Sequence, residues 1–167
     1  MMVHLPRSRW FPAALAFLAG IAVGGWLFSQ SQPRSFLAAG RCEQCYKPND
    51  LAGLLASAAI QRAGEALPFV VKETERCIAI EHPFRKVRHH YIVFPKKDVK
   101  SIADISLADH QYLLECMAVI RTLVLERGLR RYRVVTNGSG LQHVTYLHFH
   151  LLEDGGRVPA RVFEPAK

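Results

Sequence analysis

The sequence predicts an α+β domain with a five-stranded antiparallel sheet and a long helix, preceded by a single N-terminal transmembrane helix. Three observations predict this class. An uncharged apolar run near the N-terminus is long enough to cross a bilayer. Short stretches rich in β-branched and aromatic residues outnumber helical stretches, and short turns join most of them. Half of the 167 residues are hydrophobic, which suffices for one buried core.

The apolar run from Trp10 to Phe28 contains no charged residue. As a helix it would extend over roughly 28 Å, about the thickness of a bilayer core. Trp10 and Trp26 lie near its ends, where amphipathic rings favour the membrane interface. We therefore expect residues 1–30 to form an uncleaved anchor, with the domain on the periplasmic or other extracytoplasmic side. A cleaved signal sequence is the alternative, although its apolar region usually has only about 7–15 residues, and the best small-residue site lies further on, at 38–40.

Residues 31–49 are expected to link the anchor to the domain, which we place at 50–167. The linker combines two prolines with small polar residues and contains a pair of cysteines. At the start of the domain, Asp50 is expected to cap a helix over residues 51–67. Pro68 would end this helix.

Five stretches of the domain are expected to form strands. They are residues 69–74, 76–82, 89–95, 131–136 and 143–152. The third is stopped by Pro95, and the turn sequence "NGSG" joins the fourth and fifth strands into a hairpin. Strands joined by such short turns run antiparallel, which gives the predicted sheet.

A long helix is expected between the third and fourth strands. Ser106 is its predicted N-cap, an acidic first turn follows, and Gly128 is predicted to end it. The helical spacing of apolar residues predicts the face that packs on the sheet, made of Leu113, Met117, Ile120 and Val124. Cys77 in the second strand and Cys116 in this helix are expected to be small buried hydrophobic residues.

The fifth predicted strand contains two histidines at strand period in "TYLHFHLL". Side chains on a strand alternate between faces, so Leu147, Phe149 and Leu151 would face the core. Val144, Tyr146, His148 and His150 would face the other way, with the two histidines about 7 Å apart. A solvated polar face is one interpretation of this row. The other is a reaction site, because imidazole titrates near neutral pH and serves as nucleophile, acid or metal ligand.

The segment "LQHVTYLHFHLL" resembles the signature of the histidine triad (HIT) family, in which a Gly-Gln-x-Val-x segment leads into His-x-His-x-His and apolar residues. Two further stretches are similar to the family, namely "RCIAIEH" followed by "HHYIVFPKKDV", and "YRVVTNGSG" after the intervening helix. The likeness covers roughly residues 69–152. It implies a homodimer, because the family commonly joins two five-stranded sheets.

The resemblance also implies a reaction. It indicates a nucleotide hydrolase or nucleotidyl transferase of the phosphohydrolase or phosphoramidase type, acting at an α-phosphate through a nucleotidyl-histidine intermediate. His148 holds the place of the attacking histidine, and a neutral imidazole there would attack phosphorus. His150 holds the place of the histidine that binds the phosphate and helps to protonate the leaving group. This chemistry requires no cofactor.

The expected substrate-binding residues follow from the same resemblance. Asn137, Gln142 and His143 match positions beside the phosphate. His82 falls where the family often has an aspartate that holds the ribose hydroxyls. Tyr146 stands in place of the first triad histidine, an orienting group, and its hydroxyl could take over part of that role. These departures support a second hypothesis, a catalytically degenerate HIT domain that acts as a membrane-tethered nucleotide- or protein-binding module.

Cys42 and Cys45 have the spacing of two tetrahedral zinc ligands. The resemblance implies His90 as a further ligand, since many bacterial HIT proteins begin with such a pair and bind structural zinc with two histidines. A tyrosine takes the place of the other histidine, so His89 or His143 would complete the site. A disulfide and free thiols are the alternatives. The anchor and the cysteine pair also support a third hypothesis, a structural or metal-binding domain in a larger membrane assembly.

The formal charge of +8 favours anionic partners without choosing among them. We expect a nucleotide or nucleotide conjugate as the partner, and no specific nucleic acid. Lys96 and Lys97 follow the third strand and would raise the local concentration of a polyphosphate substrate. Taken without the resemblance, these two lysines belong to a solvated loop.

Overall fold

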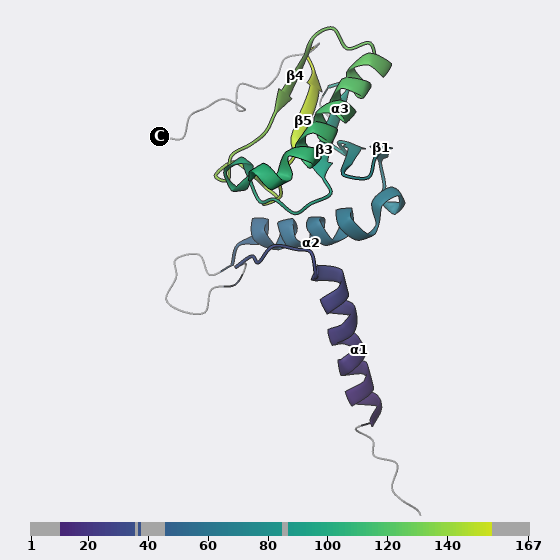
Figure 1. Ribbon diagram of the computed structural model, residues 1–167, viewed down its shortest axis with the longest axis vertical. Coiled ribbons are helices and arrows are strands. Elements are labelled where there is room, and N and C mark those ends of the chain that lie inside the picture. The colour runs from purple at the N-terminus through teal and green to yellow at the C-terminus, as the bar shows by residue number, and fades with distance from the viewer. Residues whose placement is uncertain (1–10, 36, 38–45, 85–86, 155–167) are drawn as a thin grey trace, which may run out of the picture.

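The computed structural model describes residues 11–35, 37, 46–84 and 87–154 (Figure 1). They form one five-stranded antiparallel sheet, in the order β1-β2-β3-β5-β4, with helices on either side. The main elements are α1 (Phe11–Phe28), α2 (Pro48–Arg62), β1 (Val70–Glu73), β2 (Cys77–Glu81), β3 (His90–Pro95), α3 (His110–Glu126), β4 (Tyr132–Val135) and β5 (Phe149–Glu153). Short 3-10 helices cover Gly64–Ala66, Ile102–Asp104 and Leu107–Asp109. The predicted α+β class, with five antiparallel strands and one long helix, is confirmed.

Helix α1 has 18 residues and a mean hydropathy of 1.9. None of its residues is buried, and Figure 1 shows the helix projecting away from the rest of the chain. Its length and composition are sufficient to cross a membrane, and a signal sequence near the N-terminus meets the same criteria. The helix is thus compatible with the predicted anchor, while the side of the membrane on which the domain lies stays a prediction.

Helix α2 begins earlier and ends earlier than expected. Lys47, not Asp50, occupies the N-cap position, and Pro48 is the first helical residue. Proline is favoured there because its fixed φ suits a helix and its missing N–H would have no partner. Asp50 lies in the first turn, where a carboxylate interacts favourably with the helix dipole. After Arg62 the chain passes into a 3-10 turn that starts at Gly64, which has φ +46°.

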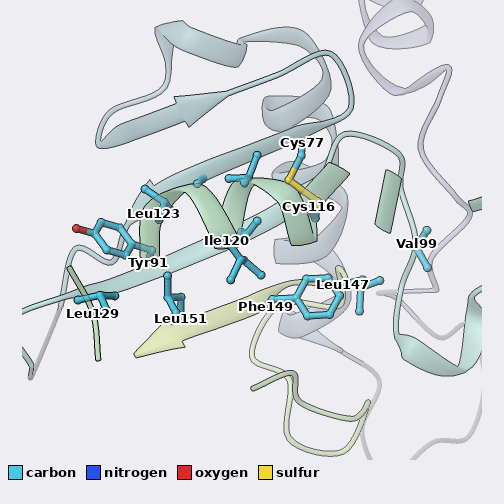
Figure 2. Close-up of a cluster of buried hydrophobic side chains, with 13 residues drawn as sticks. Cys77, Tyr91, Val99, Cys116, Ile120, Leu123, Leu129, Leu147, Phe149 and Leu151 are labelled. Atoms are coloured by element: carbon cyan, nitrogen blue, oxygen red, sulfur yellow. A yellow bond between two sulfur atoms is a disulfide. The ribbon is translucent and has the colours of Figure 1, made fainter. Parts of the chain in front are cut away.

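Helix α3 covers one face of the sheet and forms the larger core with it (Figure 2). Its buried residues are Cys116, Val119, Ile120 and Leu123, while Leu113 and Val124 pack at the margin. Met117, predicted to be part of this face, is 40% exposed. Phe149 and Leu151 of β5, and Leu147 just before this strand, complete the core, as the alternation predicted. Gly128, with φ +60°, follows the helix and terminates it as expected.

A disulfide joins Cys77 in β2 to Cys116 in α3, and Figure 2 shows it inside the core. Both residues are fully buried, as predicted, but they are not free thiols. The sequence expectation of two small hydrophobic residues is therefore corrected. Neither residue carries a pattern that indicates pairing, because 39 positions separate them and only the packing of α3 on β2 brings them together.

A second, smaller core lies on the opposite face of the sheet. Its buried members are Ile60 of α2, Ile78, Phe94 and Tyr146. This cluster covers only part of that face. The remaining part is where His90 and His150 lie, on two adjacent strands.

Strand β5 begins at Phe149, later than the predicted start at residue 143. Its pairing with β3 ends at Val93 opposite Phe149, although β3 itself continues to Pro95. The preceding residues find other backbone partners. The Leu147 N–H donates to the Val99 carbonyl at 2.7 Å, and the Thr145 N–H donates to the Asn49 carbonyl at 3.1 Å. His148 therefore lies just before the strand rather than within it.

Candidate functional site

Four histidines converge at the open part of the second sheet face, and we call them the histidine cluster: His82, His90, His148 and His150. His82 follows β2, His90 begins β3, and His150 lies in β5 next to Ile92 of β3. The His90 and His150 rings are 5.2 Å apart, and the His82 ring stacks on His90 at 4.2 Å. The His148 ring meets the His150 ring edge-on at 4.8 Å. Segments far apart in the sequence thus supply one group of imidazoles.

His148 is held in one tautomer by the backbone. Its Nδ1 lies 2.6 Å from the carbonyl oxygen of Tyr146. A carbonyl oxygen only accepts, so Nδ1 carries the proton and donates it, and the lone pair of the neutral ring is on Nε2. The residue is 8% exposed, and burial lowers its pKa although the hydrogen bond to Tyr146 opposes this effect. A neutral imidazole with a free Nε2 is the form that acts as a nucleophile.

His90 and His150 share a hydrogen bond between Nε2 of His90 and Nδ1 of His150, 3.0 Å apart. Burial, together with the nearby His148, His90 and His82, lowers the pKa of His150 to about 3. Burial and the neighbouring His82 lower the pKa of His90 to about 4. Both rings are therefore neutral at pH 7. In the tautomer in which His90 Nε2 donates, His150 Nδ1 accepts, so the proton of the neutral His150 ring is on Nε2.

A cavity of about 280 Å³ opens beside the cluster. It is lined by His90, Val135, Asn137, Leu141, His143, His150 and Leu152. Three of the residues predicted from the sequence, Asn137, His143 and His150, are thus brought together. The rest of the wall is mostly apolar, and sequence reasoning had not assigned a binding role to Val135, Leu141 or Leu152. His150 and Leu152 of β5 share a face because they are two residues apart, and Val135 of β4 adjoins them in this wall.

Two side chains that neighbour cavity-lining residues in the sequence have buried polar atoms with no hydrogen-bond partner among the residues that the structure describes. Gln142, predicted to bind substrate, is 2% exposed, and neither its amide nitrogen nor its amide oxygen has a partner. The Thr136 hydroxyl, between two cavity residues, is also without one. A buried polar group left unpaired costs about 1–3 kcal/mol, so such groups commonly bind a ligand or water. Thr136 was not predicted, since a threonine in a strand is common.

Tyr146 does not line the cavity. Its side chain is fully buried, its ring packs on Phe94 at 5.7 Å, and its hydroxyl donates to the Pro95 carbonyl at 2.5 Å. Burial and the charge of Asp98 raise the pKa of the Tyr146 hydroxyl. The hydroxyl thus has a structural partner in place of the predicted substrate contact. The backbone carbonyl of Tyr146 accepts the hydrogen bond that His148 Nδ1 donates.

The lysines that follow β3 are paired with carboxylates. Lys96 forms an ion pair with Glu73, and Lys97 lies 2.5 Å from Asp109. The bond to Lys97 and the contacts with Ser106 hold the pKa of Asp109 at about 2. These two lysines therefore contribute less free positive charge than the sequence suggested.

The predicted zinc site falls partly outside the described residues, since Cys42 and Cys45 are not among them. His90, the third predicted ligand, contacts His82 and His150. Within the described ranges, no group of three or more His, Cys, Asp or Glu side chains is arranged to hold a metal ion. Structural zinc at the cysteine pair stays a prediction.

Comparisons with known proteins show which family the chain resembles. A family model described as "Scavenger mRNA decapping enzyme C-term binding" matches residues 58–159. An uncharacterized HIT-like protein of Chlamydia trachomatis is 35% identical over 88 residues, which are 51% of this chain and 79% of the relative. One from Chlamydia muridarum is 34% identical over 88 residues, 51% of this chain and 70% of the relative.

Solved structures show the same fold. A HIT family hydrolase from Clostridium thermocellum has a TM-score of 0.54 and 27% identity, with 62% of this chain and 94% of that chain covered. A HIT family hydrolase from Legionella pneumophila has a TM-score of 0.51 and 30% identity, with 59% and 90% covered. The chain belongs to the histidine triad family, and its histidine cluster lies in the HIT domain. Helix α1 and most of α2 lie outside the matched family model.

Proposed function

We propose that the protein is a nucleotide hydrolase or nucleotidyl transferase that acts at an α-phosphate, with His148 as the nucleophile. The observation that carries this proposal is the bond from His148 Nδ1 to the Tyr146 carbonyl, which leaves Nε2 as the free lone pair. His150, which lines the cavity, lies next to the His148 ring. The HIT family hydrolases among similar structures support a hydrolase.

In the first step, the Nε2 lone pair of His148 attacks phosphorus, and the bond from phosphorus to the leaving group breaks in line. An anionic phosphate raises the pKa of an adjacent imidazole, so His150 takes up a proton when substrate binds. His150 then donates this proton to the leaving group. In the second step, water gives a proton to His150 and attacks phosphorus, which releases the nucleoside monophosphate and restores His148. A transferase would use an alcohol or amine acceptor in place of water.

Substrate binding would use the groups around the cavity. The unpaired amide of Gln142 and the side chains of Asn137 and His143 supply donors for phosphate oxygens. The apolar wall suits a nucleobase. His82 is the residue with the least support as a sugar ligand, because it stacks on His90 and is a ring in place of a carboxylate.

The test is turnover by the full-length chain in detergent. The substrates are dinucleoside polyphosphates, nucleoside phosphoramidates and CDP-lipids, the last because an anchored site could reach a lipid headgroup. His148→Asn removes the nucleophile. His110→Asn is a matched control, because the exposed His110 also contacts a main-chain carbonyl through Nδ1 but lies at the start of α3. The proposal requires turnover that His148→Asn abolishes and His110→Asn preserves; if no substrate is turned over above the His148→Asn background, it fails.

A second candidate is a binding module without turnover, which the buried Tyr146 and the unusual His82 favour. Calorimetry would then show nucleotide binding by a protein that hydrolyses none of the substrates. The homodimer and the zinc site are further proposals from the family resemblance. Light scattering coupled to size exclusion tests the dimer, and metal analysis with and without Cys42→Ser tests the zinc.

A further inference from the structure

The chain that follows α1, expected to be a linker, contains a buried charge pair. The side chains of Arg34 and Asp98 are 1% and 0% exposed. Both guanidinium nitrogens Nη1 and Nη2 bond to the carboxylate, at 2.6 Å each. The backbone N–H of Gln32 also donates to Asp98 Oδ2, at 2.7 Å. Charges removed from water are tolerated when they are paired in this bidentate way, so the pair fixes residues 32–34 on the domain.

The same guanidinium also holds the segment that leads to His148. Arg34 Nε and Nη2 donate to the Thr145 carbonyl oxygen, at 3.1 and 2.7 Å. That carbonyl belongs to the peptide between Thr145 and Tyr146. The next carbonyl along the chain, that of Tyr146, accepts the hydrogen bond donated by His148 Nδ1. The carbonyl that Arg34 binds and the carbonyl that sets the tautomer of His148 therefore belong to consecutive residues, Thr145 and Tyr146.

Residues of helix α2 contact the same segment before His148. The Asn49 carbonyl accepts from the N–H of Thr145 at 3.1 Å and from its hydroxyl at 3.2 Å. The Asn49 amide donates to the Gln142 carbonyl at 2.9 Å. Gly53 is buried at the contact, and a Cβ there would lie 2.6 Å from the Thr145 carbonyl oxygen and 2.9 Å from Arg34 Nε. Only glycine allows the helix to come this close.

We propose that Arg34 is a positioning residue for His148. It holds the peptide before Tyr146, so that the Tyr146 carbonyl keeps the proton on Nδ1 and leaves Nε2 free. This inference rests on the proposed role of His148 as nucleophile, and it extends the site to the N-terminal segment. The segment directly after the apolar helix is then a working part of the catalytic unit, and α1 is tethered to the site through only a few residues.

The first experiment uses the full-length chain in detergent and an adenosine 5′-phosphoramidate substrate. Arg34→Met is expected to lower kcat about 10- to 100-fold with less than a roughly threefold change in KM, because small displacements of a reacting group have effects of this size. Arg62→Met is the matched control. Arg62 also joins the N-terminal segment to the domain, through the Trp26 carbonyl at 2.7 Å and the Trp26 ring at 4.6 Å, but it is remote from Thr145. Its kcat should stay at the wild-type value.

A double variant, Arg34→Met with Asp98→Asn, distinguishes a positioning role of Arg34 from a role in stability alone. It removes both charges and keeps an oxygen that can accept from Gln32, so no unpaired charge is left in the interior. We expect the double variant to recover thermal stability lost in Arg34→Met but not kcat, because the bonds to Thr145 are still missing. Recovery of kcat as well would overturn the proposal. Arg34→Lys, which cannot form the bidentate pair and the Thr145 contacts together, should restore kcat only in part.

Nitrogen-15 NMR of the histidine rings gives a readout that does not depend on turnover. Wild-type His148 is expected to show the proton on Nδ1, and the Arg34→Met and double variants are expected to show a mixture of tautomers. If the wild type turns over no substrate but the tautomer shifts in this way, the proposed function fails and the positioning role stands. If turnover is present and both kcat and the tautomer are unchanged in the double variant, the positioning role is refuted and the proposed function stands.

Discussion

Replacing Tyr146 with phenylalanine distinguishes a structural tyrosine from one that contacts substrate. The hydroxyl donates to the Pro95 carbonyl at 2.5 Å, and both residues are buried. The substitution removes one buried hydrogen bond, worth about 0.5–1.5 kcal/mol, and leaves the carbonyl without that donor. We expect a loss of about 1–2 kcal/mol in the free energy of unfolding. For a domain of this size the melting temperature would fall by roughly 3–8 °C.

The same substitution should leave the reaction unchanged. The backbone carbonyl of Tyr146, which orients His148, is retained, and the phenyl ring can still pack on Phe94. Scanning fluorimetry of the full-length chain would measure the stability, and steady-state kinetics below the melting transition would measure kcat and KM. A change in KM or kcat of more than about tenfold, or about 1.4 kcal/mol, without a fall in melting temperature would refute the reasoning, because the hydroxyl would then contact substrate.

Three further predictions concern stability. Acidification should destabilise the protein as pH falls from 6.5 through the folded-state pKa values of His90, about 4, and His150, about 3. In this range the unfolded chain binds protons that the folded chain does not. Equilibrium unfolding at a series of pH values measures how the free energy of unfolding changes, and a flat profile contradicts the buried cluster. Replacing Cys77 and Cys116 with alanine removes the disulfide and should lower the free energy of unfolding by about 4 kcal/mol, the loop-closure entropy over 39 residues. Denaturant unfolding measures this loss, and an unchanged free energy would mean that the bond is absent in solution. Gly128→Ala should cost about 1 kcal/mol in the same assay, since φ is +60° at that position, and an unchanged midpoint would be inconsistent with that conformation.

Much of the site could be predicted because it follows from local periodicity. Alternation along residues 147–151 places leucine and phenylalanine in the larger core and the histidines on the opposite face, and this holds although His148 precedes the strand. Ser106 caps the 3-10 turn Leu107–Asp109 and not α3 itself, whose N-cap position is held by Asp109, so the predicted cap of the long helix is corrected. The capping interaction is still local, because the Asp109 carboxylate accepts from both the N–H and the hydroxyl of Ser106, at 2.7 Å each. Such features depend on neighbours within a few residues.

What could not be predicted depends on residues far apart in the chain. Tyr146 shares a face with His148, but whether its hydroxyl meets substrate or backbone depends on where β3 ends at Pro95. Arg34 lies among small polar residues that indicate a linker, and its partner Asp98 is 64 positions away. Neither residue belongs to a periodic pattern. A buried ion pair of this kind is visible only when the fold has brought the two charges together.

The burial of Asp98 also limits how the chain can be processed. A peptidase that cut among the small residues 38–40 would sever Arg34 from the domain. Loss of the released piece would leave a carboxylate with 0% exposure and no guanidinium, at a cost of about 3–5 kcal/mol. That is a large share of the roughly 5–15 kcal/mol that holds an ordinary domain folded. Proteolysis at this point, followed by loss of the released piece, is therefore expected to destabilise the domain.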